Sequence, residues 1–196
     1  MSNQNHPKKG STIKVEPIRD LAVIQKIKRL LNNHPRNYCL FTLGINTAFR
    51  ASDLLGIKVG DVQALKTGDS LEQKELKTKK YRRVTLNSGC IDAICRYLKY
   101  RPQSSDDEYL FVGQRGVLTV QYLNLLVKAW CKSVNAPQLN YGSHTLRKTW
   151  GYHQRVTYGA EIPQLMEAFG HTTQKQTLTY LCIQAEEIQA LYLNEL

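Results

Sequence analysis

The sequence predicts a single α+β domain that is mostly helical and carries a small β-hairpin. Three observations lead to this fold class. Several segments place apolar residues at helical spacing, two strand-like segments flank a basic turn, and neither an internal repeat nor a mid-chain linker divides the chain. With 196 residues, the chain is long enough for one domain with a hydrophobic core.

The first third of the chain predicts a tail and three helices. Residues 1–16 are polar and basic without apolar periodicity, which predicts a flexible tail. Asp20 then precedes apolar residues at near-helical spacing in residues 21–31, so we expect a helix there. Pro35 suits the first turn of a second, more apolar and more central helix in HPRNYCLFTLGINTAF. The segment SDLLGI predicts a short third helix.

The middle of the chain predicts the hairpin and two further helices. QKELKTKKYRRVTLN indicates two strands around a basic turn, because Val84 and Leu86 alternate with polar neighbours on the second strand. IDAICRYLKY is amphipathic and is followed by the helix-breaking Pro102, which predicts a helix. A short strand-like piece, YLFVG, precedes a strongly periodic helix in TVQYLNLLVKAWCKSV.

The last third predicts four helical segments. HTLRKTWGYHQRV indicates a helix that begins near Ser143, a suitable N-cap residue. Three shorter candidates follow in IPQLMEAF, in a piece that contains Tyr180, and in QAEEIQALYLNEL. We therefore expect a flexible basic tail over residues 1–16, one domain over 17–183 and a C-terminal helix over 184–196.

The charge of the chain indicates a polyanionic partner. There are 27 Lys and Arg residues against 16 Asp and Glu residues, which gives a net charge of +11. A compact basic domain attracts nucleic acid, because each neutralised phosphate releases condensed counterions. Charge runs are also common on solvated surfaces, so composition alone leaves nucleic-acid binding open. The basic residues concentrate at the hairpin, in Lys74, Lys77, Lys79, Lys80, Arg82 and Arg83.

Other features exclude several classes of protein. No apolar run approaches the length of a membrane span, and the polar start lacks the apolar segment of a secretory signal, so we expect a cytoplasmic protein. The five cysteines form no C-x-x-C pair, and their mostly apolar neighbours indicate buried thiols rather than a zinc knuckle or a disulfide framework. The sequence also offers no cluster of acidic metal ligands, so we expect no metal and no cofactor.

Two segments near the C-terminus combine residues that handle phosphate and protons. His144 and Arg147 are three residues apart, so a helix places them on one face. Arginine offers a rigid fork of donors for phosphate, and histidine is the usual general acid or base at neutral pH. Tyr180 follows His171 by nine residues, and a phenol attacks phosphorus when its proton is removed and nearby cations favour its ionised form.

Two earlier segments add an arginine and a lysine. Arg50 lies between an apolar helix and a turn-like Ser-Asp pair, and Lys77 lies just before the turn of the basic hairpin, where it can reach a phosphodiester and donate a proton. Each residue has an ordinary structural alternative. In this alternative, Arg50 has a structural role and pairs with Asp53 or a carbonyl group. Lys77 is a solvated lysine in a basic run, and Tyr180, one of eleven tyrosines, packs in the core or at an interface.

Together and in this order, the four segments resemble the catalytic domain of the tyrosine recombinase, or phage integrase, family. NTAFRASDLLGIKVGDV is similar to the first arginine box of the family, and LKTKKYRRVTL resembles its β-hairpin, whose catalytic lysine aligns with Lys77. HTLRKTWGYH is similar to the H-x-x-R box, and FGHTTQKQTLTY to the L-G-H box with its nucleophilic tyrosine. The resemblance covers roughly residues 35–183, and the ordered set is far more specific than any one motif.

The resemblance implies a site-specific DNA recombinase that cleaves and rejoins strands through a covalent 3′-phosphotyrosine. In this interpretation Tyr180 is the nucleophile, two arginines hold the phosphate, a lysine protonates the leaving oxygen, and two histidines assist. The implied catalytic residues are Arg50, Lys77, His144, Arg147, His171 and Tyr180, and the implied DNA contacts are Lys74, Lys79, Lys80, Arg82, Arg83 and Lys148. No metal and no cofactor is required, because the arginines supply the positive charge.

The sequence also departs from the family pattern. Phe169 stands where the family usually has leucine, and Leu-Cys-Ile follows Tyr180 in place of the frequent Thr-His. The polar residues 1–16 cannot form the N-terminal DNA-clamping domain of most members, so the chain resembles small stand-alone recombinases such as the fimbrial invertases. The missing clamp leaves room for an accessory protein or a partner recombinase.

Assembly and three rival functions follow from the same comparison. Joining two duplexes implies a tetramer on double-stranded DNA, in which residues 184–196 either dock on a neighbouring protomer or pack on their own domain. The rivals are a cleavage-deficient DNA-binding protein of the same fold, an enzyme resembling type IB topoisomerases, and an ordinary basic module with chance motifs. The last predicts that Arg50, Arg147, His171 and Tyr180 do not converge in space.

Overall fold

The structure, a computed structural model, describes residues 14–75, 79–182 and 189–195, and it confirms a mostly helical α+β fold. The helices of this part of the chain are α1 (Leu21–Leu30), α2 (Pro35–Gly44), α3 (Ala51–Leu55), α4 (Ser88–Leu98), α5 (Val120–Ser133), α6 (Thr145–Val156), α7 (Ile162–Phe169) and α8 (Gln174–Leu181). The antiparallel strand pairs are β1 (Ser70–Lys74) with β2 (Tyr81–Thr85), and β3 (Val112–Gly113) with β4 (Gly116–Val117).

Local signals determine where several helices begin. The side chain of Asp20 accepts a hydrogen bond from the backbone N–H of Ala22, and Pro35 occupies the first turn of α2, as the sequence predicts. Helix α4 begins a turn earlier than the periodic segment IDAICRYLKY, because Asn87 caps it by accepting from the N–H of Cys90. The strand-like YLFVG contributes only the two residues of β3.

The predicted N-cap of α6 is wrong by one residue. His144, not Ser143, occupies the N-cap position, and its side chain makes no capping hydrogen bond. The N–H of Ser143 instead donates to Oδ1 of Asn124 on α5 (3.1 Å), which holds the chain outside the helix at that point. This contact joins residues far apart in sequence, so local capping preferences cannot reveal it.

The two ends of the chain differ in part from expectation. Glu16, which we expected in the flexible tail, donates its N–H to the carbonyl of Asn140 (2.9 Å), and its own carbonyl accepts from the hydroxyl of Thr145 (2.9 Å). Residues 14–16 therefore pack on the domain, while residues 1–13 lie outside the described residues. Within the expected helix over 184–196, the described residues 189–195 contain a 3-10 helix, η1 (Ala190–Leu193), and residues 184–188 and 196 lie outside the description.

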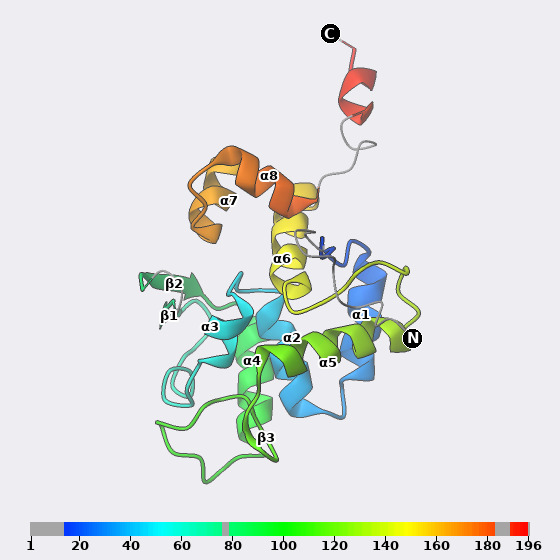
Figure 1. The fold of residues 1–196 in the computed structure, drawn as a ribbon. Coiled ribbons are helices and arrows are strands. Elements are labelled where there is room, and N and C mark those ends of the chain that lie inside the picture. Colours follow the sequence, from blue (N-terminus) through cyan, green and yellow to red (C-terminus); the bar gives the residue numbers. More distant parts are fainter. Residues whose placement is uncertain (1–13, 76–78, 183–188, 196) are drawn as a thin grey trace, which may run out of the picture.

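Two clusters of buried apolar side chains hold the domain together. The larger core lies among α1 to α5, the β1–β2 hairpin and the loops between them. The smaller core consists of Ala48, Leu165, Phe169 and Leu181. Figure 1 shows α7 and α8 beside each other at one end of the molecule, with α6 running from them to the body formed by the earlier helices. The second core therefore lies where the last three helices meet the loop before α3.

Two further features of the structure concern membrane-spanning helices and the five cysteines. Within the described ranges, no helix is both long and apolar enough to cross a membrane. All five cysteines are free, and Cys39, Cys90, Cys131 and Cys182 are buried, which confirms the interpretation as buried thiols for these four. Cys95 is exposed.

Candidate active site

Arg147 joins three segments at the smaller core. It projects from α6 with only 3% of its surface exposed. Its guanidinium group donates to the carbonyl of Ala48 before α3 and to the carbonyl of Phe169 at the end of α7 (2.7 Å). Burial lowers the pKa of Arg147 to about 10, which still leaves it protonated at neutral pH. A cation is thus fixed by two carbonyl groups beside the aromatic residues of α7 and α8.

The backbone at Ala48 adopts an unusual conformation that serves this contact. Its φ angle of 55° lies in the left-handed region, which costs a residue with a Cβ about 1–2 kcal/mol. The same residue presents its carbonyl to Arg147. Strained backbone of this kind persists where surrounding contacts determine it, and it concentrates at functional sites.

Arg50 lies close by at the N-cap position of α3. Its guanidinium group forms an ion pair with Glu75 and lies 3.8 Å from Oδ2 of Asp53, which is buried. The pairing with Asp53 that the sequence offered as a structural alternative is therefore present, although Glu75 makes the closer contact. The carboxylates hold Arg50 at the edge of the site while 19% of its side chain stays exposed.

Glu75 is a site residue that sequence analysis missed. It is only 4% exposed, and its Oε1 also accepts from Nε of Arg82 (2.8 Å), so one carboxylate lies between two guanidinium groups. Arg82 additionally donates to the carbonyl of Ala168, which connects strand β2 to helix α7. The available signal is that Glu75 is the one acidic residue between Lys74 and Arg83. A lone acid in a basic run suggests a charge with a specific partner.

His171 follows Gly170, the C-cap residue of α7, and contacts the nucleophile candidate. Its ring stacks on Phe169 with centroids 5.0 Å apart, and the ring of Tyr180 meets it edge-on at 5.2 Å. Burial lowers the pKa of His171 above all, and neighbouring guanidinium groups add to the effect and bring it to about 4. The groups that add to it are those of Arg147, Arg50 and Arg82. His171 is therefore a neutral imidazole at pH 7.

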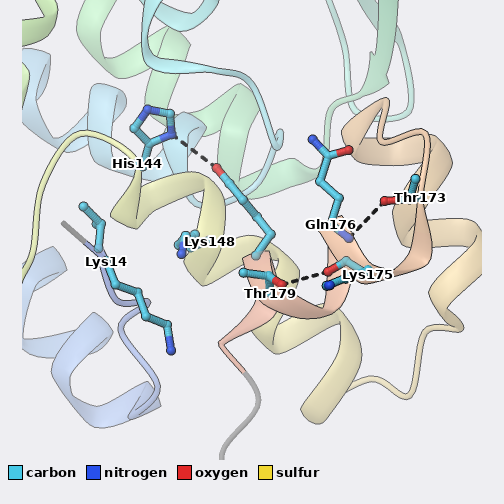
Figure 2. Close-up of a pocket in the computed structure, with 9 residues that line it drawn as sticks. Lys14, His144, Lys148, Thr173, Lys175, Gln176 and Thr179 are labelled. Atoms are coloured by element: carbon cyan, nitrogen blue, oxygen red, sulfur yellow. Dashed lines mark hydrogen bonds between the residues drawn. The ribbon is translucent and has the colours of Figure 1, made fainter. Parts of the chain in front are cut away.

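Tyr180 is half-buried on α8 between cations and aromatic rings. The guanidinium carbon of Arg147 lies 5.8 Å from its ring centroid, and the phenol oxygen lies 3.4 Å from Nδ1 of His144, as the dashed line from His144 in Figure 2 indicates. Burial raises the pKa of Tyr180, and the positive charges of Arg147 and Arg50 offset only part of that rise. The phenol is protonated at neutral pH, and the exposed His144 lies next to its oxygen.

A cavity of about 760 Å³ opens beside Tyr180 (Figure 2). Three lysines and a histidine give it a basic lining, which suits an anionic ligand. The lining residues are Lys14, Val15, His144, Lys148, Thr173, Lys175, Gln176, Thr179 and Tyr180.

Lys148, one of the predicted DNA contacts, is buried close to Tyr180. It is 7% exposed, and its Nζ donates to Sγ of Cys182 (3.1 Å) and lies 4.9 Å from the ring centroid of Tyr180. The reason is its position on the inner side of α6, where the end of α8 covers it. Lys148 therefore stands next to the nucleophile candidate rather than on an exposed face.

The remaining predicted DNA contacts lie on the hairpin. Lys74, Lys79, Lys80 and Arg83 are exposed, whereas Arg82 is mostly buried against Glu75. Lys77, the predicted catalytic lysine, lies outside the described residues. Among the residues described, no group of three or more His, Cys, Asp or Glu side chains is arranged to hold a metal ion.

The structure thus brings Arg50, Arg147, His171 and Tyr180 around one another, with His144 at the phenol. This arrangement contradicts the interpretation as an ordinary basic module with chance motifs. A comparison with known families supports the same conclusion, since the model of the Phage integrase family matches residues 20–187. The chain belongs to the phage integrase family.

Individual relatives in the phage integrase family agree. The chain is 36% identical over 184 residues to "Probable integrase/recombinase YoeC" of Bacillus subtilis (strain 168), covering 91% of this chain and 95% of that protein. It is 31% identical over 177 residues to "Tyrosine recombinase XerC" of Caldanaerobacter subterraneus subsp. tengcongensis, covering 85% of this chain and 48% of that protein. The chain therefore spans nearly the whole of the first relative and about half of the second.

Solved structures show the same fold. A crystal structure of XerA recombinase has a TM-score of 0.75 at 20% identity, covering 94% of this chain and 66% of that chain. The structure of XerH site-specific recombinase bound to palindromic difH substrate has a TM-score of 0.74 at 21% identity, covering 93% of this chain and 53% of that chain. Family and fold together identify a tyrosine-type site-specific recombinase. The two alternatives, a cleavage-deficient DNA-binding protein and an enzyme resembling topoisomerases, are not favoured.

Proposed function

We propose that this integrase-family chain cleaves a strand of duplex DNA with Tyr180 and rejoins it to a new partner strand. The observation that supports this most is the packing of the Tyr180 ring against both Arg147 and His171. Its phenol oxygen attacks a scissile phosphate, an O–P bond to tyrosine forms, and the bond from phosphorus to the 5′-oxygen breaks. The covalent 3′-phosphotyrosine retains the energy of the phosphodiester, so rejoining requires no nucleotide cofactor.

Arg50 and Arg147 bind the non-bridging oxygens in this proposal. Charge builds up on these oxygens in the transition state, and donors already held in position stabilise it without reorganisation. Both arginines are anchored, Arg147 by two carbonyl groups and Arg50 by the carboxylates of Glu75 and Asp53. A guanidinium group has five N–H donors, so an anchored arginine retains donors for phosphate. His171 adds a further donor.

Two proton transfers complete the reaction. His144 takes the proton from the Tyr180 phenol, to which its Nδ1 is already adjacent. Lys77 gives a proton to the departing 5′-oxygen, an assignment that comes from the family resemblance. The buried Lys148 has its cation 4.9 Å from the ring centroid of Tyr180, which favours a role in orienting the phenol and stabilising its ionised form.

The DNA partner and the assembly belong to the same proposal. The exposed basic residues of the hairpin contact the DNA backbone, and double-stranded DNA gathers a tetramer that holds two duplexes. Residues 184–196 dock on a neighbouring protomer or on their own domain, after a catalytic domain that extends to residue 183. An accessory protein or a partner recombinase supplies additional contacts with DNA. The reaction takes place in the cytoplasm.

A covalent adduct tests the proposal. Wild-type protein, Tyr180→Phe and the control Tyr100→Phe, whose tyrosine is 71% exposed, are incubated with labelled nicked duplexes tiled across the DNA that flanks the gene. We expect an adduct that survives denaturant with the wild type and the control, and none with Tyr180→Phe. An adduct with Tyr180→Phe would identify a different nucleophile and overturn the proposal, and so would the absence of an adduct with the wild type on every duplex.

A further inference from the structure

A buried hydroxyl on the nucleophile's helix contacts the imidazole of His171. The side chain of Thr177 is fully buried, and its Oγ1 lies 3.0 Å from Nδ1 of His171. Thr177 precedes Tyr180 by three residues, so the two side chains lie on the same side of α8, about one turn apart. The contact therefore connects the loop between α7 and α8 to the helix that carries the phenol.

The position of the single imidazole proton on His171 has chemical consequences. Because its pKa is lowered to about 4, by burial and by three neighbouring guanidinium groups, the ring is neutral at pH 7 and carries one N–H. A proton on Nε2 makes that nitrogen a hydrogen-bond donor, which suits an anionic phosphate oxygen. A proton on Nδ1 leaves Nε2 an acceptor, which repels it.

The surroundings of Thr177 decide between these two tautomers. Thr179, two residues further along α8, donates its hydroxyl proton to the carbonyl of Lys175 (2.8 Å). Among the described residues, the hydroxyl of Thr177 contacts Nδ1 of His171. If Nδ1 carried the proton, the buried hydroxyl proton would lose its acceptor, at a cost in stability. Donation from Thr177 to Nδ1 avoids this cost and places the imidazole proton on Nε2.

We propose that Thr177 is a positioning residue, whose hydroxyl donates to Nδ1 of His171 and so keeps Nε2–H available as a donor to the scissile phosphate. The part that concerns phosphate rests on the proposed function, whereas the tautomer of His171 does not. The same contact connects the imidazole to α8, the helix that carries Tyr180.

The tautomer is measured on the protein without DNA. Protein with ¹⁵N-labelled histidine is studied by NMR at pH 7 through two-bond ¹H–¹⁵N couplings, which distinguish Nε2–H from Nδ1–H rings, and His171→Gln assigns the signal. We expect the Nε2–H form in wild type, in Thr177→Ser, which retains the hydroxyl, and in the control Thr179→Val. We expect Thr177→Val to show a mixture or the Nδ1–H form. An Nδ1–H ring in wild type, or an unchanged ring in Thr177→Val, would overturn the proposal.

Cleavage separates positioning from a general loss of structure. We expect Thr177→Val to form the covalent adduct about tenfold more slowly in single turnover, the factor that corresponds to a hydrogen bond worth ~1.4 kcal/mol, with unchanged DNA affinity. Thr177→Ser restores the rate, and Thr67→Val, a change at an exposed threonine before β1, keeps it. If the wild type shows the Nε2–H form through Thr177 but forms no adduct, the proposed function fails and the positioning of His171 stands. If Thr177→Val does not fold, the wild-type and Thr177→Ser rings still decide.

Discussion

Glu75 balances the positive charge of the site at the residue scale. Its carboxylate lies between the guanidinium groups of Arg50 and Arg82 with little exposure to water. Removing one partner of a buried ion pair leaves an uncompensated charge, so we expect Glu75→Ala to lower the free energy of unfolding by about 3 kcal/mol. Urea denaturation measures this value. Glu72→Ala, an exposed change on the preceding strand β1, should stay within about 0.5 kcal/mol of wild type, and equal stability of the two variants would contradict the prediction.

His171 makes the stability depend on pH. Its pKa is lowered from 6.5 to about 4 in the folded protein, so the unfolded chain binds a proton that the folded chain does not as the pH falls below 6.5. The contribution of the neutral ring is therefore complete above pH 6.5 and is lost progressively between pH 6.5 and 4. We expect the free energy of unfolding to fall less steeply from pH 7 to 5 in His171→Gln than in wild type or in His34→Gln, whose histidine is exposed. Identical slopes in all three would refute this.

The last three helices depend on one close contact at the element scale. A Cβ added at Gly151 on α6 would overlap the ring of Phe169 and lie 3.1 Å from Leu181. Alanine is the better helix former, yet overpacking costs about 1–3 kcal/mol, so we expect Gly151→Ala to destabilise the protein. Gly89→Ala on α4, where a Cβ meets only an ordinary contact at 3.5 Å, should be neutral or stabilising in the same thermal unfolding measurement. Stabilisation by both would show that the packing has room.

The elements also show how far the sequence predicts the structure. Helices such as α1 and α5 follow from apolar periodicity and a cap, which are local properties. The resemblance of the ordered motifs to a known family predicts the convergence of Arg50, Arg147, His171 and Tyr180, whereas Lys77 lies outside the described residues. The capping of α6, the burial of Lys148 and the role of Glu75 depend on contacts across the chain, with Asn124, Cys182 and Arg82. Neither periodicity nor motif spacing contains that information.

The basic surface acts at the scale of the whole molecule. The net charge of +11 and the exposed lysines and arginine of the hairpin predict DNA affinity that falls steeply with salt. We expect Arg83→Ala to weaken binding about equally for all DNA sequences and to reduce the slope of log affinity against log salt by about 1. Fluorescence anisotropy over a range of salt concentrations measures the slope. Lys99→Ala, at the other end of α4 from the hairpin, should leave it unchanged; an equal effect of both would argue against contact through the hairpin.

The burial of Tyr180 has a consequence for a cell that carries this chain. An enzyme that searches a chromosome touches a vast number of phosphodiesters, and each is a potential break. A phenol that keeps its proton is a weak nucleophile, and burial raises the pKa of Tyr180 by more than the guanidinium groups of Arg147 and Arg50 lower it. In the proposed reaction, DNA binding and strand cleavage are therefore separate events, because cleavage also requires the phenol to lose its proton, and His144 is the group next to its oxygen.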